Sequence, residues 1–529
     1  LAYRRSLVEL ISQYFYVAQI VERLRDHISG PVQIVPNRVE TAWACWVGGQ
    51  LVRALASDLI EGDLCFPSWV MVVVAIYDFW QRVLGVGAIG CVVLAALRDC
   101  LLLRSDSQQD FDLAIAIVSP RREFTQESRG VGFLLAEEPL RSLRGLFVPL
   151  TALAAAHKQY LAEHNFAVAD RGSLSSGDWR KMLWAAASVS PWLPGWMLLT
   201  SARNFRTYSI WRGFVRKYGI RAFISYADFG IVHIGRNILL KQAGISTWYY
   251  SDAGNLGNWH ATSSGAPPLT FSLWCYLYYD HFVIWNDRLL RYMQEHRQRI
   301  GQYHVVGCLW AERISQLRRS VSESKYWVDL EKAGYKTGQK LVVVFDTWFH
   351  PDGMNVAEDL VRFADDIRIW LDERTDVFLV LKEKNPPYAM MKMFNRQSCE
   401  RIYDSHRRLA AHPRVVVFGD VHDALELASL ANLVVSFPFT SITYESLCSG
   451  MKAVYYDPAE KMRGTYYDQF PGLILHGYHE LRQGLNLLLV QTENEFVSRI
   501  AQAAPRSTEL FLGDGAMTRF RELLSQSLA

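Results

Sequence analysis

Residues 433–458 read LVVSFPFTSITYESLCSGMKAVYYDP, which predicts a buried strand, a turn rich in hydroxyl side chains, a short helix and a second buried strand. The apolar run at its start is typical of a parallel strand covered by helices on both faces. Ser436, Thr440 and Ser441 follow that run. Because the free N–H groups and the positive dipole end of a helix attract oxyanions, this order of elements predicts a phosphate site at the start of the helix.

Glu445 lies about one turn inside the predicted helix. A carboxylate at that position can accept hydrogen bonds from the two hydroxyls of a ribose beside the phosphate. Turns between a strand and a helix also favour Ser, Thr and Gly for conformational reasons alone. A purely structural turn is therefore the alternative for this segment.

Three preceding strands end in polar residues. They are KLVVVFD (340–346), DVFLVLKEK (376–384) and RVVVFGD (414–420), and the helical stretches 355–373, 422–431 and 442–449 alternate with the strands. This alternation predicts parallel βαβ units, whose ligands bind at the carboxyl ends of the strands. We expect a nucleotide and its phosphate to contact Lys382, Lys384, Ser436, Thr440, Ser441 and Glu445. For the two lysines the alternative is a solvated strand end.

The succession strand-LKEKNP, strand-FGD, strand-SFPFTS-ITYESLCSG, strand-YYDP resembles the nucleotide-binding half of a GT-B glycosyltransferase. Within that fold it is most similar to bacterial surface-carbohydrate biosynthesis proteins named for a Pro-Phe-Thr-Ser motif, which stands here at residues 438–441. A more distant likeness is to bacterial sialyltransferases and Kdo transferases, whose CMP-sugar site has a Lys-x-His-Pro turn. Here Lys384 replaces that His and Asn385 replaces that Pro, which weakens the case for a CMP-activated acid sugar as donor.

The resemblance implies an α/β fold of the GT-B type, with two Rossmann-like domains facing a cleft and a mostly helical N-terminal elaboration. It also implies catalysis without a bound metal and without a cofactor, since the nucleotide-sugar is a substrate. We expect residues 1–105 to form a helical, hydrophobic region, 106–308 an acceptor domain, 309–338 a linker, 339–478 the donor domain, and 479–529 helices that pack back on the first domain.

Strands of the first Rossmann-like half are predicted at RAFIS (221–225), TWYYS (247–251), HFVIW (281–285) and YHVV (303–306). Asp228 follows the first of these strands and Asp252 follows the second. Inverting sugar transfer needs a base for the proton of the acceptor hydroxyl, and a partly desolvated carboxylate suits that role. Asp252 is favoured over Asp228 because it precedes a loop rich in Gly and Asn. An Asp that caps a turn is the alternative for each.

The leaving nucleoside phosphate needs positive charge as its bond to the sugar breaks. Lys382, Lys384 and His350 can supply it, and we count His350 among the catalytic candidates. His350 stands in the sequence FHPDG, which is also typical of an ordinary turn with an exposed histidine.

Two apolar runs, Val70–Ile76 and Val83–Leu97, are separated by a short segment that contains Asp78, Gln81 and Arg82. A membrane-spanning helix needs about 20 apolar residues. We therefore predict buried core helices here, with an interfacial hairpin as the alternative.

Residues 179–217 alternate Trp with Arg and Lys, a composition that suits the headgroup layer of an anionic membrane. A structural role in the protein core and the binding of single-stranded nucleic acid are the alternatives for this segment.

The net charge of +3 gives no general signal for nucleic acid, and the eight scattered cysteines indicate a reducing compartment. We expect a cytoplasmic protein on the inner face of a bacterial inner membrane.

The sequence thus predicts a glycosyltransferase that moves a sugar from a nucleotide-sugar to a lipid-linked or growing surface polysaccharide. Two alternatives stay open. One is a polyol-phosphate transferase of the CDP-glycerol kind, and the other is a catalytically inactive, nucleotide-binding scaffold of a polysaccharide assembly complex.

Overall fold

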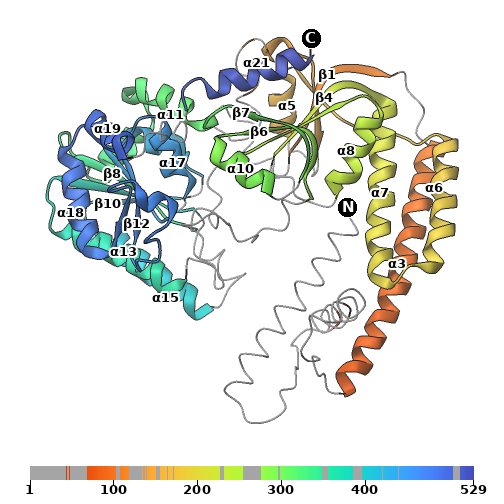
Figure 1. The fold of residues 1–529 in the computed structure, drawn as a ribbon, viewed down its shortest axis with the longest axis horizontal. Coiled ribbons are helices and arrows are strands. Elements are labelled where there is room, and N and C mark those ends of the chain that lie inside the picture. The colour runs from red at the N-terminus through yellow and green to blue at the C-terminus, as the bar shows by residue number, and fades with distance from the viewer. Residues whose placement is uncertain are drawn as a thin grey trace.

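The structure is a computed structural model (Figure 1). It describes residues 68–102, 108–117, 140–149, 155–163, 165–170, 172–226, 232–253, 276–295, 298–347, 356–384, 396–419, 421–438, 440–503 and 513–528, together with residues 43, 47, 134 and 138.

Seven parallel strands form the first sheet, in the order β3-β2-β1-β4-β5-β6-β7. Their bounds are β1 Gln109–Ile117, β2 Gly145–Pro149, β3 Phe166–Val168, β4 Tyr218–Ser225, β5 Ser246–Tyr250, β6 Tyr278–Ile284 and β7 Arg299–Val305. The four predicted strands of this half correspond to β4 to β7. The helices of this half are α5 Ala155–Glu163, α6 Ser176–Val189, α7 Gly195–Lys217, α8 Val232–Gln242 and α10 Asp287–Glu295.

Six parallel strands form the second sheet, in the order β10-β9-β8-β11-β12-β13. Their bounds are β8 Lys340–Phe345, β9 Val377–Lys382, β10 Val415–Phe418, β11 Leu433–Ser436, β12 Ala453–Asp457 and β13 Ile474–His476. The helices between them are α13 Ala357–Asp372, α15 Arg396–Ala410, α16 Ala424–Leu430 and α17 Ser441–Cys448. Both sheets have the strand order of a doubly wound Rossmann fold, so the predicted α/β architecture of two Rossmann-like halves is confirmed.

Two helices, α11 (Leu309–Arg319) and α12 (Tyr326–Lys332), occupy the stretch between the two sheets. α11 packs on α16 and α17 of the second half and on α21. Its Trp310 is fully buried in a core that also contains strand residues of both sheets. This stretch is therefore part of the folded core between the two halves.

The C-terminal helices are α18 (Gly477–Val490), α19 (Glu493–Ala503) and α21 (Ala516–Leu528). α18 packs on β12 and β13 of the second sheet. α21 instead returns to the first half, where the Phe520 ring lies 5.7 Å from the Tyr250 ring between centroids. Arg519 Nε also donates to the Val306 carbonyl at 2.8 Å. Figure 1 shows α21 crossing from one half to the other.

Helix α3 (Ser68–Leu102) is one continuous helix of 35 residues, so the prediction of two buried core helices is wrong. Asp78 accepts hydrogen bonds from Trp43 Nε1 at 3.0 Å and from Arg82 Nε at 3.3 Å. These polar residues pair one helical turn apart and do not end the helix. Among the described residues, the segment Val70–Leu102 is long and apolar enough to cross a membrane, with a mean hydropathy of 1.9 and only 22% of its most apolar window buried.

The tryptophans of 179–217 differ in their environments. Trp179 Nε1 donates to the Val93 carbonyl of α3 at 3.0 Å, and Trp211 is buried in the core beneath β4. Trp184 and Trp192 are exposed. A structural role in the core therefore accounts for Trp179 and Trp211, but it does not account for Trp184 and Trp192.

Two glycine substitutions test how closely α7 packs against the backbone at Gly172. An ideal Cβ on Gly213 of α7 would lie 2.3 Å from the Gly172 carbonyl oxygen, whereas one on Gly87 of α3 has no atom within 4 Å. We expect Gly213→Ala to destabilise the protein by about 1–3 kcal/mol through backbone displacement. Gly87→Ala should instead stabilise α3 by about 1 kcal/mol. Thermal denaturation checks both, and equal melting temperatures for the two variants would contradict the packing of α7.

Candidate active site

Each sheet changes its winding direction at one place, between β1 and β4 in the first sheet and between β8 and β11 in the second. Ligands of doubly wound sheets bind outside the carboxyl ends of the strands at such a switch point. Residues 437–440 and α17 follow β11, and Asp346 follows β8. The predicted phosphate turn therefore lies at the switch point of the second sheet.

Thr440 is the N-cap residue of α17, with an extended backbone (φ −69°, ψ 125°) and no side-chain capping hydrogen bond. Its Oγ1 is shielded from solvent and has no hydrogen-bond partner among the residues that the structure describes. Ser441 opens the helix and is partly exposed. Because the first N–H groups of a helix have no carbonyl partner within it, this end of α17 presents donors to an oxyanion.

Two predicted ligand residues, Ser436 and Glu445, are fully buried, with 0% exposure each. The Ser436 and Thr443 hydroxyls lie 2.6 Å apart, which ties β11 to α17. Glu445 lies near the Cys308 thiol, whose pKa is raised by burial first and then by Cys448 and Glu445. The contact of either side chain with a nucleotide stays a prediction.

Tyr444 connects α17 to the first half of the protein. Its ring stacks on Trp285 at 5.9 Å between centroids and 19° between planes. Asn286 Nδ2 donates to the Tyr444 hydroxyl at 2.7 Å, and all three side chains are buried. We call this group, Tyr444 with Trp285 and Asn286, the Tyr444 seam. It joins the helix of the phosphate turn to the carboxyl end of β6.

Asp252 lies beside this seam, two residues after the end of β5, and is partly exposed. Trp310 Nε1 donates to the Asp252 carbonyl at 2.7 Å, and Trp285 Nε1 donates to the Ser251 carbonyl at 2.8 Å. Trp285 and Trp310 therefore hold the backbone that carries Asp252, the favoured candidate for the base. The other two catalytic candidates, Asp228 and His350, lie outside the described residues.

Asp346 is a further candidate residue that the sequence analysis did not select. It is 4% exposed at the switch point, and its Oδ1 accepts the Lys384 backbone N–H at 2.6 Å. Burial raises the pKa of Asp346 to about 7, and the nearby negative charge of Glu383 raises it further. The hydrogen bond from the Lys384 N–H and the positive charges of Lys382 and Lys384 lower this pKa, but by less. Burial also lowers the pKa of the neighbouring His406 to about 4, which keeps that imidazole neutral. The available signal was an Asp directly after an apolar strand.

Of the two predicted lysines, Lys382 is 6% exposed and its Nζ donates to the Glu383 carbonyl at 2.8 Å. Lys384 is exposed, and Asp346 holds its backbone. Lys384 is thus the better placed of the two to meet a phosphate from solvent. Within the described ranges, no group of three or more His, Cys, Asp or Glu side chains is arranged to hold a metal ion.

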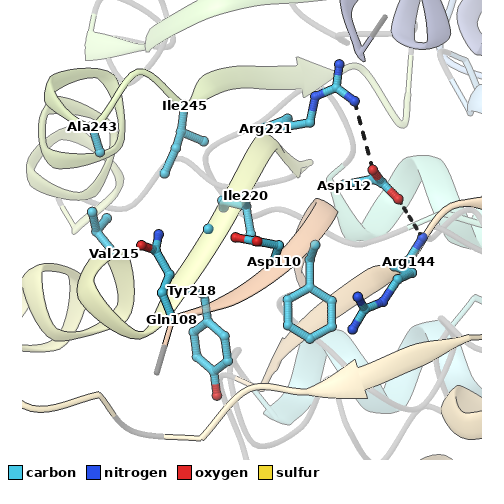
Figure 2. A pocket seen from close by; sticks show the side chains of 12 residues that line it. Gln108, Asp110, Asp112, Arg144, Val215, Tyr218, Ile220, Arg221, Ala243 and Ile245 are labelled. Carbon is cyan, nitrogen blue, oxygen red and sulfur yellow. Dashed lines mark hydrogen bonds and ion pairs between the residues drawn. The ribbon is translucent and has the colours of Figure 1, made fainter. Parts of the chain in front are cut away.

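A cavity of about 460 Å³ lies at the opposite edge of the first sheet (Figure 2). Residues at the amino-terminal ends of β1 and β4, among them Asp110 and Tyr218, line it. Asp112 accepts the Arg144 backbone N–H there at 2.8 Å and lies 3.9 Å from Arg221. None of the candidate site residues lines this cavity, so we do not assign the reaction to it.

The family described as polysaccharide biosynthesis PFTS motif protein matches residues 196–485, more than half of the chain. No curated protein matches. Similar solved structures include a UDP-forming α,α-trehalose-phosphate synthase from Burkholderia xenovorans (11% identity, TM-score 0.46, 79% of this chain and 98% of that chain). A second is the wall teichoic acid polymerase TagF (10% identity, TM-score 0.45, 86% of this chain and 98% of that chain). A third is the S. aureus MnaA–UDP structure (12% identity, TM-score 0.45, 79% of this chain and 98% of that chain).

We expect Asp346→Asn to flatten the pH dependence of stability. The pKa of Asp346 is about 7 when folded against an ordinary 3.8, so between these values the native state binds more protons than the unfolded state. Stability from this group is fully present below pH 3.8 and is lost as the pH rises through 7, by an amount on the order of a few kcal/mol. Asn keeps an acceptor for the Lys384 N–H but does not ionise.

Urea denaturation at pH 5 and pH 8 measures the effect. The fall in the free energy of unfolding between these pH values should be smaller in Asp346→Asn than in the wild type. Asp404→Asn, at an exposed carboxylate of α15, is the matched control and should keep the wild-type fall. Equal falls in all three proteins would contradict the buried, ionisable Asp346.

Proposed function

The chain belongs to the family of polysaccharide biosynthesis PFTS motif proteins, and from that premise we propose that it is a glycosyltransferase. It moves a sugar from a nucleotide-sugar donor to a lipid-linked or growing surface polysaccharide, such as a capsule or O-antigen. The observation that carries the proposal is the start of α17, where an uncapped helix end and the shielded Thr440 hydroxyl lie at the switch point of the second sheet.

The donor phosphates bind the N–H groups at the start of α17, with the hydroxyls of Thr440 and Ser441 beside them. Lys384 supplies positive charge from the end of β9, and Asp346 holds the backbone N–H of that lysine. These groups stabilise the negative charge that forms on the phosphate as its bond to the sugar breaks. Lys382 and His350 are further candidates for the same role.

Asp252 takes the proton of the acceptor hydroxyl. The acceptor oxygen bonds to the anomeric carbon as the bond between that carbon and the phosphate oxygen breaks, so the sugar transfers with inversion. The Tyr444 seam supports this assignment because it joins α17 to the strand ends that carry Asp252. Asp228 is the second candidate base. The reaction requires no metal in this proposal, since helix N–H groups and lysines provide the positive charge.

A binding experiment tests the phosphate site. Calorimetry of the full chain with CMP, CDP, UDP, GDP and dTDP identifies the nucleotide, because a ligand of the folded state also raises its melting temperature. In Lys384→Ala/Ser441→Ala the affinity should fall by about tenfold or more, since each charge-assisted hydrogen bond contributes roughly 1.5–3 kcal/mol. Ser449→Ala, at the other end of α17, is the control and should bind normally. Unaltered affinity in the double variant would contradict the site.

An activity experiment separates an enzyme from a scaffold. With the nucleotide-sugar of the preferred nucleotide, Asp252→Asn should lose transfer or donor hydrolysis by at least about 100-fold while nucleotide affinity is retained. Asp287→Asn, at the first residue of α10, serves as the control. Full activity in Asp252→Asn would remove Asp252 as the base. Selective binding of CDP would favour polyol-phosphate transfer, and no binding of any nucleotide would favour the scaffold.

A further inference from the structure

Helix α3 projects beyond the helices that it packs against (Figure 1). An ideal Cβ on Gly195, the first residue of α7, would lie 3.2 Å from Arg82, and one on Gly85 would lie 2.5 Å from Leu198. The two helices therefore run in parallel, with Arg82 of α3 level with the first turn of α7. The first 14 residues of α3, about 20 Å of helix, precede that level.

One side of the projecting part of α3 is apolar and exposed, whereas Val70 and Val74 are buried against Trp43. Phe79 is 61% exposed and Trp80 is 54% exposed, and three aliphatic residues of the two preceding turns are exposed as well, namely Val72, Val73 and Ile76. Trp192, in the turn between α6 and α7 just before Gly195, is 84% exposed. We call these six residues the bundle tip. On the surfaces of soluble proteins, a group of large exposed apolar side chains usually marks a site that binds another protein, a membrane or a ligand.

The helices behind the bundle tip are mainly basic, and we call their exposed basic residues the basic collar. α6 and α7 together carry seven basic residues and a single acidic one, Asp178, which pairs with Arg212. Four of the basic side chains are exposed, namely Arg180, Lys181, Arg203 and Arg206. An apolar tip with Trp residues and a basic collar complements an anionic bilayer, whose headgroups attract the charge and whose acyl region accepts the tip.

The same basic collar limits how deep the helix goes. α3 is long enough to span a bilayer, but its second half packs along α6 and α7. A spanning α3 would carry the exposed arginines and lysine of those helices into the hydrocarbon, where charged side chains are rarely found. The arrangement fits insertion of the tip from one side.

We infer that the bundle tip lies on the side of the first sheet where its strands end. In a doubly wound fold the connecting helices run antiparallel to the strands, so their N-termini lie at the carboxyl edge of the sheet. α7 ends at Lys217 and β4 begins at Tyr218, without a loop between them. Trp211 and Phe214 of α7 are buried against Phe223 of β4, which fixes the angle of the helix to the sheet.

We propose that α3, α6 and α7 form a monotopic membrane module that inserts the bundle tip into an anionic bilayer and holds the strand ends of the first sheet at the headgroup layer. The acceptor is then a lipid-linked saccharide presented by that bilayer. This second statement rests on the proposed glycosyltransferase function, whereas membrane insertion does not.

Co-sedimentation of the full chain with vesicles tests the insertion. Wild-type protein should partition onto vesicles of phosphatidylethanolamine and phosphatidylglycerol, and much less onto vesicles of phosphatidylcholine. Phe79→Ser/Trp80→Ser/Trp192→Ser should lose at least about tenfold in partitioning. The control Val421→Ser/Val490→Ser, at exposed apolar residues of the second half, should partition as the wild type does.

A charge variant tests the collar independently of the tip. Changing Arg180, Lys181, Arg203 and Arg206 to Gln should weaken binding to anionic vesicles by about fivefold per residue and reduce its salt dependence. Nucleotide affinity, measured on the same proteins, should be unchanged, so a failure here is distinguishable from a failure of the phosphate site. Wild-type protein that ignores anionic vesicles, or a tip variant that binds them normally, would overturn the inference. So would a wild-type dimer that the tip variant converts to a monomer.

Discussion

The hydrogen bond between Asn286 and Tyr444 is the contact on which the rest of the arrangement depends. A buried phenol needs a partner for its hydroxyl, and here that partner comes from the other half of the chain, with Trp285 stacked on the ring. Burial is the main cause that raises the pKa of Tyr444, so the group stays a neutral member of the contact. Tyr444 lies one helical turn from Thr440, and the phosphate turn is consequently fixed relative to the first half.

A second rigid connection joins the first sheet to the helices α3, α6 and α7. α7 passes directly into β4, and buried aromatic rings hold the two elements together. The Tyr444 seam and this connection link the start of α17, through the first sheet and α7, to the bundle tip. An acceptor delivered at the bundle tip and a donor held at α17 would therefore meet at a position that the packing sets.

The sequence predicts the second sheet well because β8, β9, β11 and β12 consist mainly of consecutive apolar residues. In the first sheet only parts of the strands have this signal, such as the last residues of β6, whereas β7 reads RIGQYHV and begins four residues before the predicted start. β2 and β3 have five and three residues, too few for a periodic pattern. α3 is mispredicted because the pairing of Asp78 with Arg82 cannot be recognised from a hydropathy window. The phosphate turn is found from residue order, whereas the burial of Ser436, Glu445 and Asp346 depends on which strands become neighbours. Tertiary packing decides which strands become neighbours, and the local sequence marks Asp346 only as a polar residue directly after an apolar strand.

The most direct measurement is hydrogen exchange of the full chain with and without the nucleotide that it binds. The account predicts that protection on binding is greatest in peptides covering residues 436–445, where the backbone N–H groups at the start of α17 receive the phosphate. Peptides covering residues 108–112, beside the cavity at the opposite edge of the first sheet, should not change. Protection at that cavity with unaltered exchange at the start of α17 would contradict the central claim.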